Sequence, residues 1–182
     1  REKKCSNFGY IMLLNILANR SFNDIDHYPI FPWILKDYSS DTIDLSNESI
    51  FRDLTKAICT PNESKSKHFH GFISHSTVTS YLQRISPFNE IAKKYDSKQE
   101  MTDLKSSYEK ATNEKYQEIT PEFFFMPEFL MNDALNRYPD NCINNMKDVI
   151  LPPWCKNPLD FIYIHKKALE SDFVSQNLNQ WI

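Results

Sequence analysis

The sequence predicts a mainly α-helical domain whose helices are interrupted by extended, proline-containing segments. Apolar residues recur at helical spacing in several separate stretches, whereas prolines punctuate the most aromatic ones. With 41% hydrophobic and 14% aromatic residues, the 182-residue chain can bury a sizeable core. We therefore expect one domain, or most of one.

The N-terminal stretch from Ser6 to Tyr38 dominates this pattern. Ser6 is a good helix N-cap, and the apolar run that follows predicts a helix ending near Asn19. Pro29 and Pro32 then exclude a regular helix and favour an extended segment. The apolar density is high enough that we expect both pieces to be buried, so polar groups within them need partners.

Three further helices are predicted before residue 112. Ser46 or Asn47 caps a short helix that carries Ile50, Phe51 and Leu54. Apolar spacing over 78–85, stopped by Pro87, predicts another, and the stripe over 101–111 predicts a third.

The C-terminal part begins with an aromatic-dense stretch, 119–131, which two prolines prevent from forming one helix, so we expect an irregular buried segment. Residues 149–154 read as extended. Asn157 as cap, Pro158 as the first helical residue and Asp160 near it form the best helix start in the chain. Helical spacing then continues to Ile182.

Composition excludes several classes of function. Glycines occur at positions 9 and 71 only, which excludes a glycine-rich phosphate loop. The net charge is −3 without a basic stripe, so nucleic acid is not an expected partner. The longest apolar run is too short to span a bilayer. Four scattered cysteines favour free thiols in a reducing compartment over disulfides.

The sequence contains only weak indications of a metal site or an acid–base site. His68, His70 and His75 lie close in sequence with Cys59 upstream, but the spacing fits zinc poorly, so surface histidines are favoured. Acidic pairs, Asp24 with Asp26 and Glu122 with Glu128, lack an accompanying nucleophile or orienting histidine, which favours capping and ion pairing. No catalytic residue, cofactor or metal is predicted.

Two groups of residues leave alternatives open. Arg20, Asn23 and Asp24 either form a polar lock for the backbone of 28–33, which is favoured, or an exposed binding determinant. The aromatic block from Phe123 to Phe129 is more simply core, although it is also suited to wall a peptide groove.

Motifs in order along the chain resemble the BEACH domain family. They are Ser6–Phe8, Asn15–Ser21, Asn23–Asp24, Tyr28–Ile34, Phe51–Leu54, Ser80–Leu82, Pro87–Phe88, Pro121–Phe124, Pro127–Phe129, Leu151–Trp154, Ala168–Ser171, Val174–Ser175 and Leu178–Ile182. Gly9 stands where the family usually has glutamate, which predicts a less well capped first helix. The family's glycine-tyrosine-lysine ending is absent, so the resemblance is to a partial domain over residues 1–182.

The resemblance implies an irregular α-rich fold whose extended core segments lack regular sheet pairing. It implies a non-enzymatic scaffold in vesicle traffic, lysosome-related organelles or autophagy, in the cytoplasm and peripheral to membranes through other domains. A PH-like module is expected to precede the domain and WD repeats to follow it. Proteins or peptides would bind where the domain meets the PH-like module, with Arg20 and Asp24, or Arg52 and Asp53, as charged contacts. The alternative is a regulatory domain within a kinase-like multidomain enzyme.

Overall fold

The computed structural model describes residues 5–56, 58, 74–94, 100–115, 117–132 and 146–182. Its α-helices are α1 (Asn7–Leu17), α2 (His75–Leu82), α3 (Phe88–Lys94), α4 (Leu104–Lys110), α6 (Pro158–Leu169) and α7 (Asp172–Trp181). Strand pairing within these residues is limited to isolated bridges, among them Phe31 with Ile119 and Leu35 with Phe51. The predicted mainly α fold with extended core segments that lack sheet pairing is therefore confirmed.

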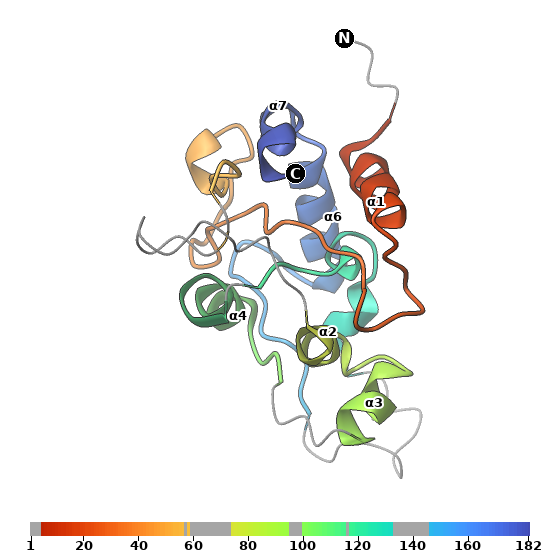
Figure 1. Cartoon of the computed structure of the whole chain (residues 1–182). Coiled ribbons are helices and arrows are strands. Elements are labelled where there is room, and N and C mark those ends of the chain that lie inside the picture. Colours follow the sequence, from red (N-terminus) through yellow and green to blue (C-terminus); the bar gives the residue numbers. More distant parts are fainter. Residues whose placement is uncertain (1–4, 57, 59–73, 95–99, 116, 133–145) are drawn as a thin grey trace.

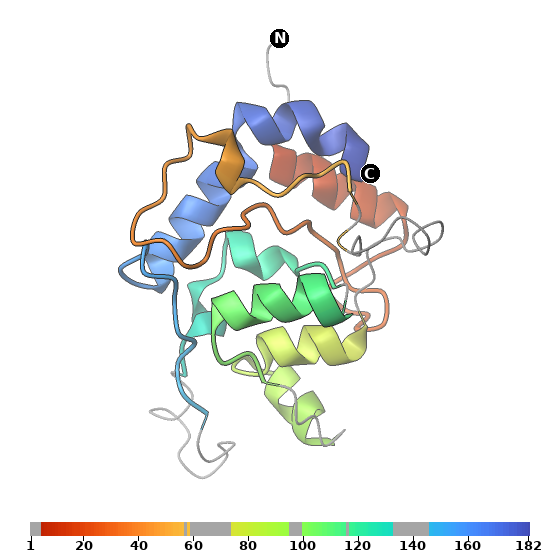
Figure 2. The same ribbon diagram turned by 90° about the vertical axis from the view of Figure 1, so that its left-hand side faces the viewer.

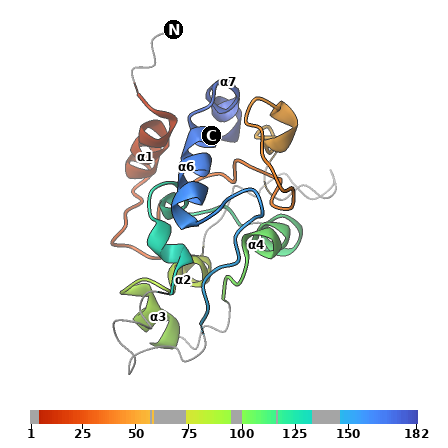
Figure 3. The ribbon, with the colours of Figure 1, turned by 180° about the vertical axis from the view of Figure 1, so that it is seen from behind.

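The helices form two groups joined through the middle of the molecule. Helices α1 and α7 lie at one end and α2, α3 and α4 toward the other, while α6 runs between the groups (Figure 1). The extended segment that follows α1 crosses the molecule between these groups, which the rotated views show equally well (Figures 2 and 3). This segment therefore has packing partners on opposite sides.

The start of α1 is capped twice. Ser6 accepts a hydrogen bond from Gly9 N at 3.0 Å, as its N-cap position predicts. The carboxylate of Glu170, at the end of α6, accepts from Asn7 N at 2.9 Å and Phe8 N at 3.0 Å. A glutamate from a distant part of the chain thus satisfies the first N–H groups, and its negative charge lies where the helix dipole is positive.

The expectation that α1 is buried is wrong for its outer face. Asn7, Ile11 and Asn15 are buried, whereas Leu13 is 51% and Leu17 is 74% exposed. The polar side chains face inward because they bond to backbone. Asn7 Nδ2 donates to Leu169 O at 2.7 Å, which ties α1 to the end of α6.

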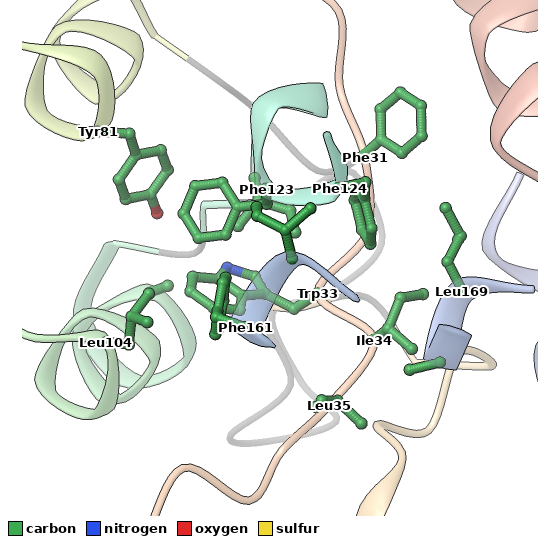
Figure 4. Packing of buried hydrophobic residues seen from close by; sticks show 14 of the residues in the cluster. Phe31, Trp33, Ile34, Leu35, Tyr81, Leu104, Phe123, Phe124, Phe161 and Leu169 are labelled. Atoms are coloured by element: carbon green, nitrogen blue, oxygen red, sulfur yellow. The ribbon is translucent and has the colours of Figure 1, made fainter. Parts of the chain in front are cut away.

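The extended segment forms the centre of the core. Its residues from Tyr28 to Leu35 are all buried, as predicted, and Trp33 has no exposed surface. The Trp33 ring packs edge-on against Tyr38, Tyr108 and Phe123, with centroids 5.3–5.6 Å apart. Figure 4 shows Trp33 together with Tyr81, Phe123 and Phe161, large side chains that come from segments far apart in the sequence.

Several predicted helices are shorter than their apolar spacing suggests. Only a 3-10 turn, η1 (Glu48–Ile50), follows the Asn47 cap, because Phe51 is extended and pairs with Leu35. Helix α4 is followed by a π-helical turn, η2 (Ala111–Lys115). The C-terminal stripe is split into α6 and α7 because Ser171 serves as a new N-cap, accepting from Val174 N at 3.3 Å.

The aromatic stretch is irregular and largely buried, as predicted. It forms two 3-10 turns, η3 (Pro121–Phe124) and η4 (Pro127–Leu130), each with proline in its first turn. Phe123, Phe124 and Phe129 are fully buried, but Phe125 is 44% exposed. The Asn157 cap is also as predicted, with Asp160 N donating to Asn157 Oδ1 at 2.9 Å. The predicted extended region before α6 is extended only as far as Pro152, because Pro153 and Trp154 form a turn in which Cys155 N donates to Pro152 O at 3.1 Å.

Candidate functional site

Hydrogen bonds from side chains hold the first half of the extended segment. The amide of Asn15 binds Ile30 at both backbone groups, accepting from its N–H at 2.8 Å and donating to its carbonyl at 2.9 Å. Arg20 Nη1 donates to the Tyr28 carbonyl at 3.1 Å. These side chains replace the ladder bonds that a strand next to prolines lacks, and so fix this part of the segment.

An ion pair holds the second half. The carboxylate of Glu118 accepts from Trp33 N at 2.8 Å, from Arg52 Nη2 at 2.9 Å and from Trp181 Nε1 at 3.0 Å. Arg52 Nε in turn donates to the Trp33 carbonyl at 2.9 Å. Burial raises the pKa of Glu118, and the charge of Arg52 with these donors offsets part of the rise.

The candidate residues predicted from the sequence occupy different environments. Arg20 is partly exposed, and Arg52 is buried in the ion pair. Asn23 and Asp24 are exposed in the turn after α1, where Asp24 accepts from the backbone of Asp26 and from His27.

The hydrogen bond from the His27 side chain lowers the pKa of Asp24. Asp53 is exposed and organises its own turn, accepting from the N–H and the hydroxyl of Thr55. Lys56 pairs with the same carboxylate at 3.2 Å. A partner-binding role for these five residues stays a prediction.

A pocket opens beside the first half of the segment. Its volume is about 610 Å³, within the range of small-molecule sites. Three parts of the chain form it: the turn after α1, the region from α2 to α3, and the aromatic stretch. Its walls are Phe22, Asn23, Ile25, Tyr28, Ile85, Ser86, Pro87, Phe88, Ile91, Glu122, Phe125 and Met126.

Glu122 is the acidic residue in the wall of this pocket. Its side chain is nearly inaccessible, with 4% of the residue exposed. Tyr28 donates its hydroxyl to Glu122 Oε1 at 2.7 Å, but the buried Oε2 atom has no hydrogen-bond partner in the part of the chain that the structure describes. Burial raises the pKa of Glu122, and hydrogen bonding by Tyr28 offsets part of that rise.

Aromatic rings surround the acid. Phe22 and Phe88 each pack edge-on against Tyr28, at centroid distances of 5.6 and 5.8 Å. Phe22 and Phe125 are 46% and 44% exposed, although both are large apolar side chains. The pocket thus combines partly exposed rings with a desolvated carboxyl group, an arrangement that suits a ligand with both apolar and hydrogen-bonding groups.

Sequence reasoning missed His165, a fully buried histidine on α6. It stacks on Phe161 at 4.5 Å and shares a hydrogen bond of 3.0 Å with the Tyr38 hydroxyl. Burial lowers its pKa to about 3, so the ring is neutral at pH 7. Its spacing of four from Phe161 and Leu169 was the available signal.

The predicted histidine group falls mostly outside the described residues, namely Cys59, His68 and His70. His75 is described, and its Nδ1 lies 3.4 Å from Asp26. Across the part of the chain that the structure describes, histidine, cysteine and acidic side chains form no group of three that could hold a metal. None of the helices in that part is long and apolar enough to cross a membrane.

Comparison with known proteins defines the class of this domain. A family model described as the Beige/BEACH domain matches residues 1–182. The chain therefore belongs to the BEACH family, as its motifs predict.

Relatives from distant organisms match nearly the whole chain. It is 38% identical over 211 residues to a putative neurobeachin homolog of Caenorhabditis elegans, covering 100% of the chain and 8% of the relative. The human WD repeat- and FYVE domain-containing protein 4 is 38% identical over 216 residues, covering 100% and 7%. Beige protein homolog 1 of Saccharomyces cerevisiae is 38% identical over 213 residues, covering 97% and 10%. The chain thus spans about a tenth or less of these relatives.

Proposed function

We propose that the chain is a non-enzymatic scaffold domain that binds proteins or peptides in vesicle traffic, lysosome-related processes or autophagy. The observation that carries this proposal is the pocket, whose rim presents two half-exposed phenylalanines on a rigid base. Aromatic side chains dominate the binding energy of protein interfaces, and rigidity lowers the entropy cost of binding.

The rigid base is the hydrogen-bonded extended segment. Tyr28 belongs to that segment and to the pocket wall at once, so Asn15 and Arg20 hold one side of the pocket through backbone bonds. A partner that contacts the rim meets a preformed surface.

The family context supports the wider role. BEACH domains typically pack against a PH-like module, and one relative carries WD repeats in its printed name. We place the partner at the seam with such a module, with exposed Asp24 and Asp53 and partly exposed Arg20 as charged contacts. Membrane association would be peripheral, through other domains of a longer cytoplasmic protein.

Proximity labelling in cells tests the proposal. The chain is expressed as wild type, as a Phe22→Ala/Phe125→Ala double variant, and as a Tyr163→Ala control, which removes a 64% exposed aromatic on α6. We expect trafficking, lysosomal or autophagy proteins to be labelled by wild type and control, and labelling to fall at least fivefold for the double variant. Equal labelling by all three proteins would contradict the proposal.

A further inference from the structure

We propose that the pocket binds the side chain of a lysine or arginine from a protein partner, with Glu122 as the anionic anchor and the surrounding rings as its walls. This inference deepens the proposed function and rests on it.

The orphan oxygen of Glu122 carries the argument. Oε1 is satisfied by Tyr28, but Oε2 is buried without a hydrogen-bond partner among the described residues, and leaving such an atom unpaired is unfavourable. An N–H donor that enters the pocket removes this cost. An apolar group leaves it in place, and an anion adds repulsion in a site where charge is poorly screened.

The rings favour a cation over a neutral donor. Phe22, Tyr28, Phe88 and Phe125 all line the cavity, and the faces of aromatic rings attract ammonium and guanidinium groups. The alkyl part of a lysine or arginine side chain packs against the remaining apolar wall, supplied by Ile25, Ile85 and others. Both ends of such a side chain are thereby accommodated.

Charges at the rim agree with this assignment. Asn23 and Ile25 line the cavity, and Asp24 and Asp26 alternate with them on the same exposed turn. His27 and His75 lie against these two carboxylates, and Arg20 is bonded to the backbone of Tyr28 nearby. The turn thus carries two carboxyl groups near the entrance, and Arg20 carries one basic group.

A quaternary ammonium group does not meet the same requirement. Choline, as in lipid headgroups, offers a charge for the rings but no N–H for Glu122 Oε2. A primary ammonium or a guanidinium offers both. Lysine and arginine are the protein side chains with these groups, and the proposed function as a protein-binding domain selects a protein as their source.

Titration of the 182-residue chain followed by NMR tests the assignment. The probes are butylammonium and propylguanidinium, with choline and butyrate for comparison, and the signals are the Glu122 carboxyl carbon and the rings of Phe22 and Phe125. We expect the first two probes to bind at about millimolar concentration, as befits so few atoms. Choline is expected to bind at least fivefold more weakly, and butyrate not measurably.

Three variants separate the anchor from the fold. Glu122→Gln should weaken both cationic probes at least tenfold, and Phe125→Ala about threefold. Glu128→Gln, a matched change at an exposed acid on the neighbouring turn, should leave binding unchanged. Circular dichroism and the remaining NMR signals show whether each variant is folded.

Equal binding of choline, or binding that survives Glu122→Gln in the folded protein, would overturn the inference, as would failure of both cations to bind. These binding results do not change the outcome expected from the proximity-labelling experiment. If labelling depends on Phe22 and Phe125 while no cation binds, the scaffold proposal stands and the ligand assignment falls. If cations bind while labelling is independent of the pocket, the scaffold proposal falls.

Discussion

Glu118 and Glu122 lie four residues apart and are both buried, yet their surroundings differ. Glu118 receives three hydrogen bonds and the charge of Arg52, and both of its oxygens are paired. Glu122 accepts one close hydrogen bond, from Tyr28, and lesser hydrogen bonding from Thr120 and its own backbone also lowers its pKa. Its Oε2 atom has no close partner among the described residues, and the residue lines a pocket. Desolvation raises the pKa of both carboxyl groups, but it is opposed by a buried cation and three hydrogen bonds at Glu118 and by hydrogen bonds alone at Glu122.

The difference separates a structural acid from one free to bind a ligand. At Glu118 the protein supplies every partner, so the group joins the extended segment, the region after η1 and α7. At Glu122 a partner is missing where space is available. Burial and a raised pKa therefore do not by themselves distinguish the two acids, whereas the pairing of their oxygen atoms does.

The largest effect is expected from Glu118→Gln. The change leaves the buried Arg52 guanidinium without its counter-charge, which costs about 3–5 kcal/mol of unfolding free energy. Urea denaturation at pH 7 measures this loss. A loss below about 1 kcal/mol would show that the two acids do not differ as described.

The buried His165 shows the effect of desolvation on a group that is positively charged when protonated. Burial lowers the pKa of His165 to about 3. Below pH 6.5 this histidine therefore binds a proton in the unfolded chain but stays neutral in the folded protein. Stability is therefore full above pH 6.5 and falls as the pH decreases toward 3. Between pH 6.5 and 5 we expect a loss of about 2 kcal/mol from this group.

The measurement is the pH dependence of unfolding in wild type and in His165→Gln. The variant lowers overall stability through lost ring packing, but its curve should be flatter over the same interval. Parallel curves would refute the assignment of the pH dependence to His165.

A smaller effect of opposite sign is expected from Glu122. Its raised pKa means that the folded protein retains a proton that the unfolded chain releases above about pH 4.5. Stability from this group is present below pH 4.5 and declines as the pH rises through the folded pKa. Glu122→Gln should remove that decline, so that the variant gains stability relative to wild type as the pH rises from 4.5 to 7.

Thermal unfolding of both proteins across this interval checks the prediction. Glu128→Gln again serves as the control, because the residue is exposed. A variant that loses stability relative to wild type as the pH rises would break the contrast with Glu118.

The smallest effect is expected on the outer face of α1. Leu17→Ser alters a side chain that is 74% exposed, so the unfolding free energy should change by less than about 0.5 kcal/mol. Asn15→Ala, on the inner face, removes both bonds to Ile30 and should cost about 2 kcal/mol. Chemical denaturation of both variants should give the opposite order of costs to the one that hydrophobicity alone predicts. A larger cost for Leu17→Ser than for Asn15→Ala would contradict this expectation.

Much of the fold was predictable because its signals are local. Proline restricts the backbone at its own position and the one before it, so the extended segment and the broken aromatic stretch could be inferred. The caps at Ser6 and Asn157 follow the same logic, since each bonds to an N–H three residues along.

Less of the candidate site could be predicted from the sequence. Arg20 was a candidate from the sequence, but its bond to Tyr28 depends on the path of the turn between them. Glu122 was visible as an acid in an aromatic stretch, although nothing local showed that one oxygen would be paired and the other not. Glu118 and His165 were missed because their partners come from distant segments.

The sequence by itself determined where helices begin, where the backbone must be extended, and to which family the chain belongs, because capping, proline geometry and motif order act over a few residues. Only the tertiary structure decided which polar groups are paired. It turned Asn7 and Asn15 of α1 inward and Leu13 and Leu17 outward, and it paired both oxygens of Glu118 while leaving Glu122 beside an open pocket. The physical reason is that desolvation and its compensation depend on side chains brought together from across the whole chain.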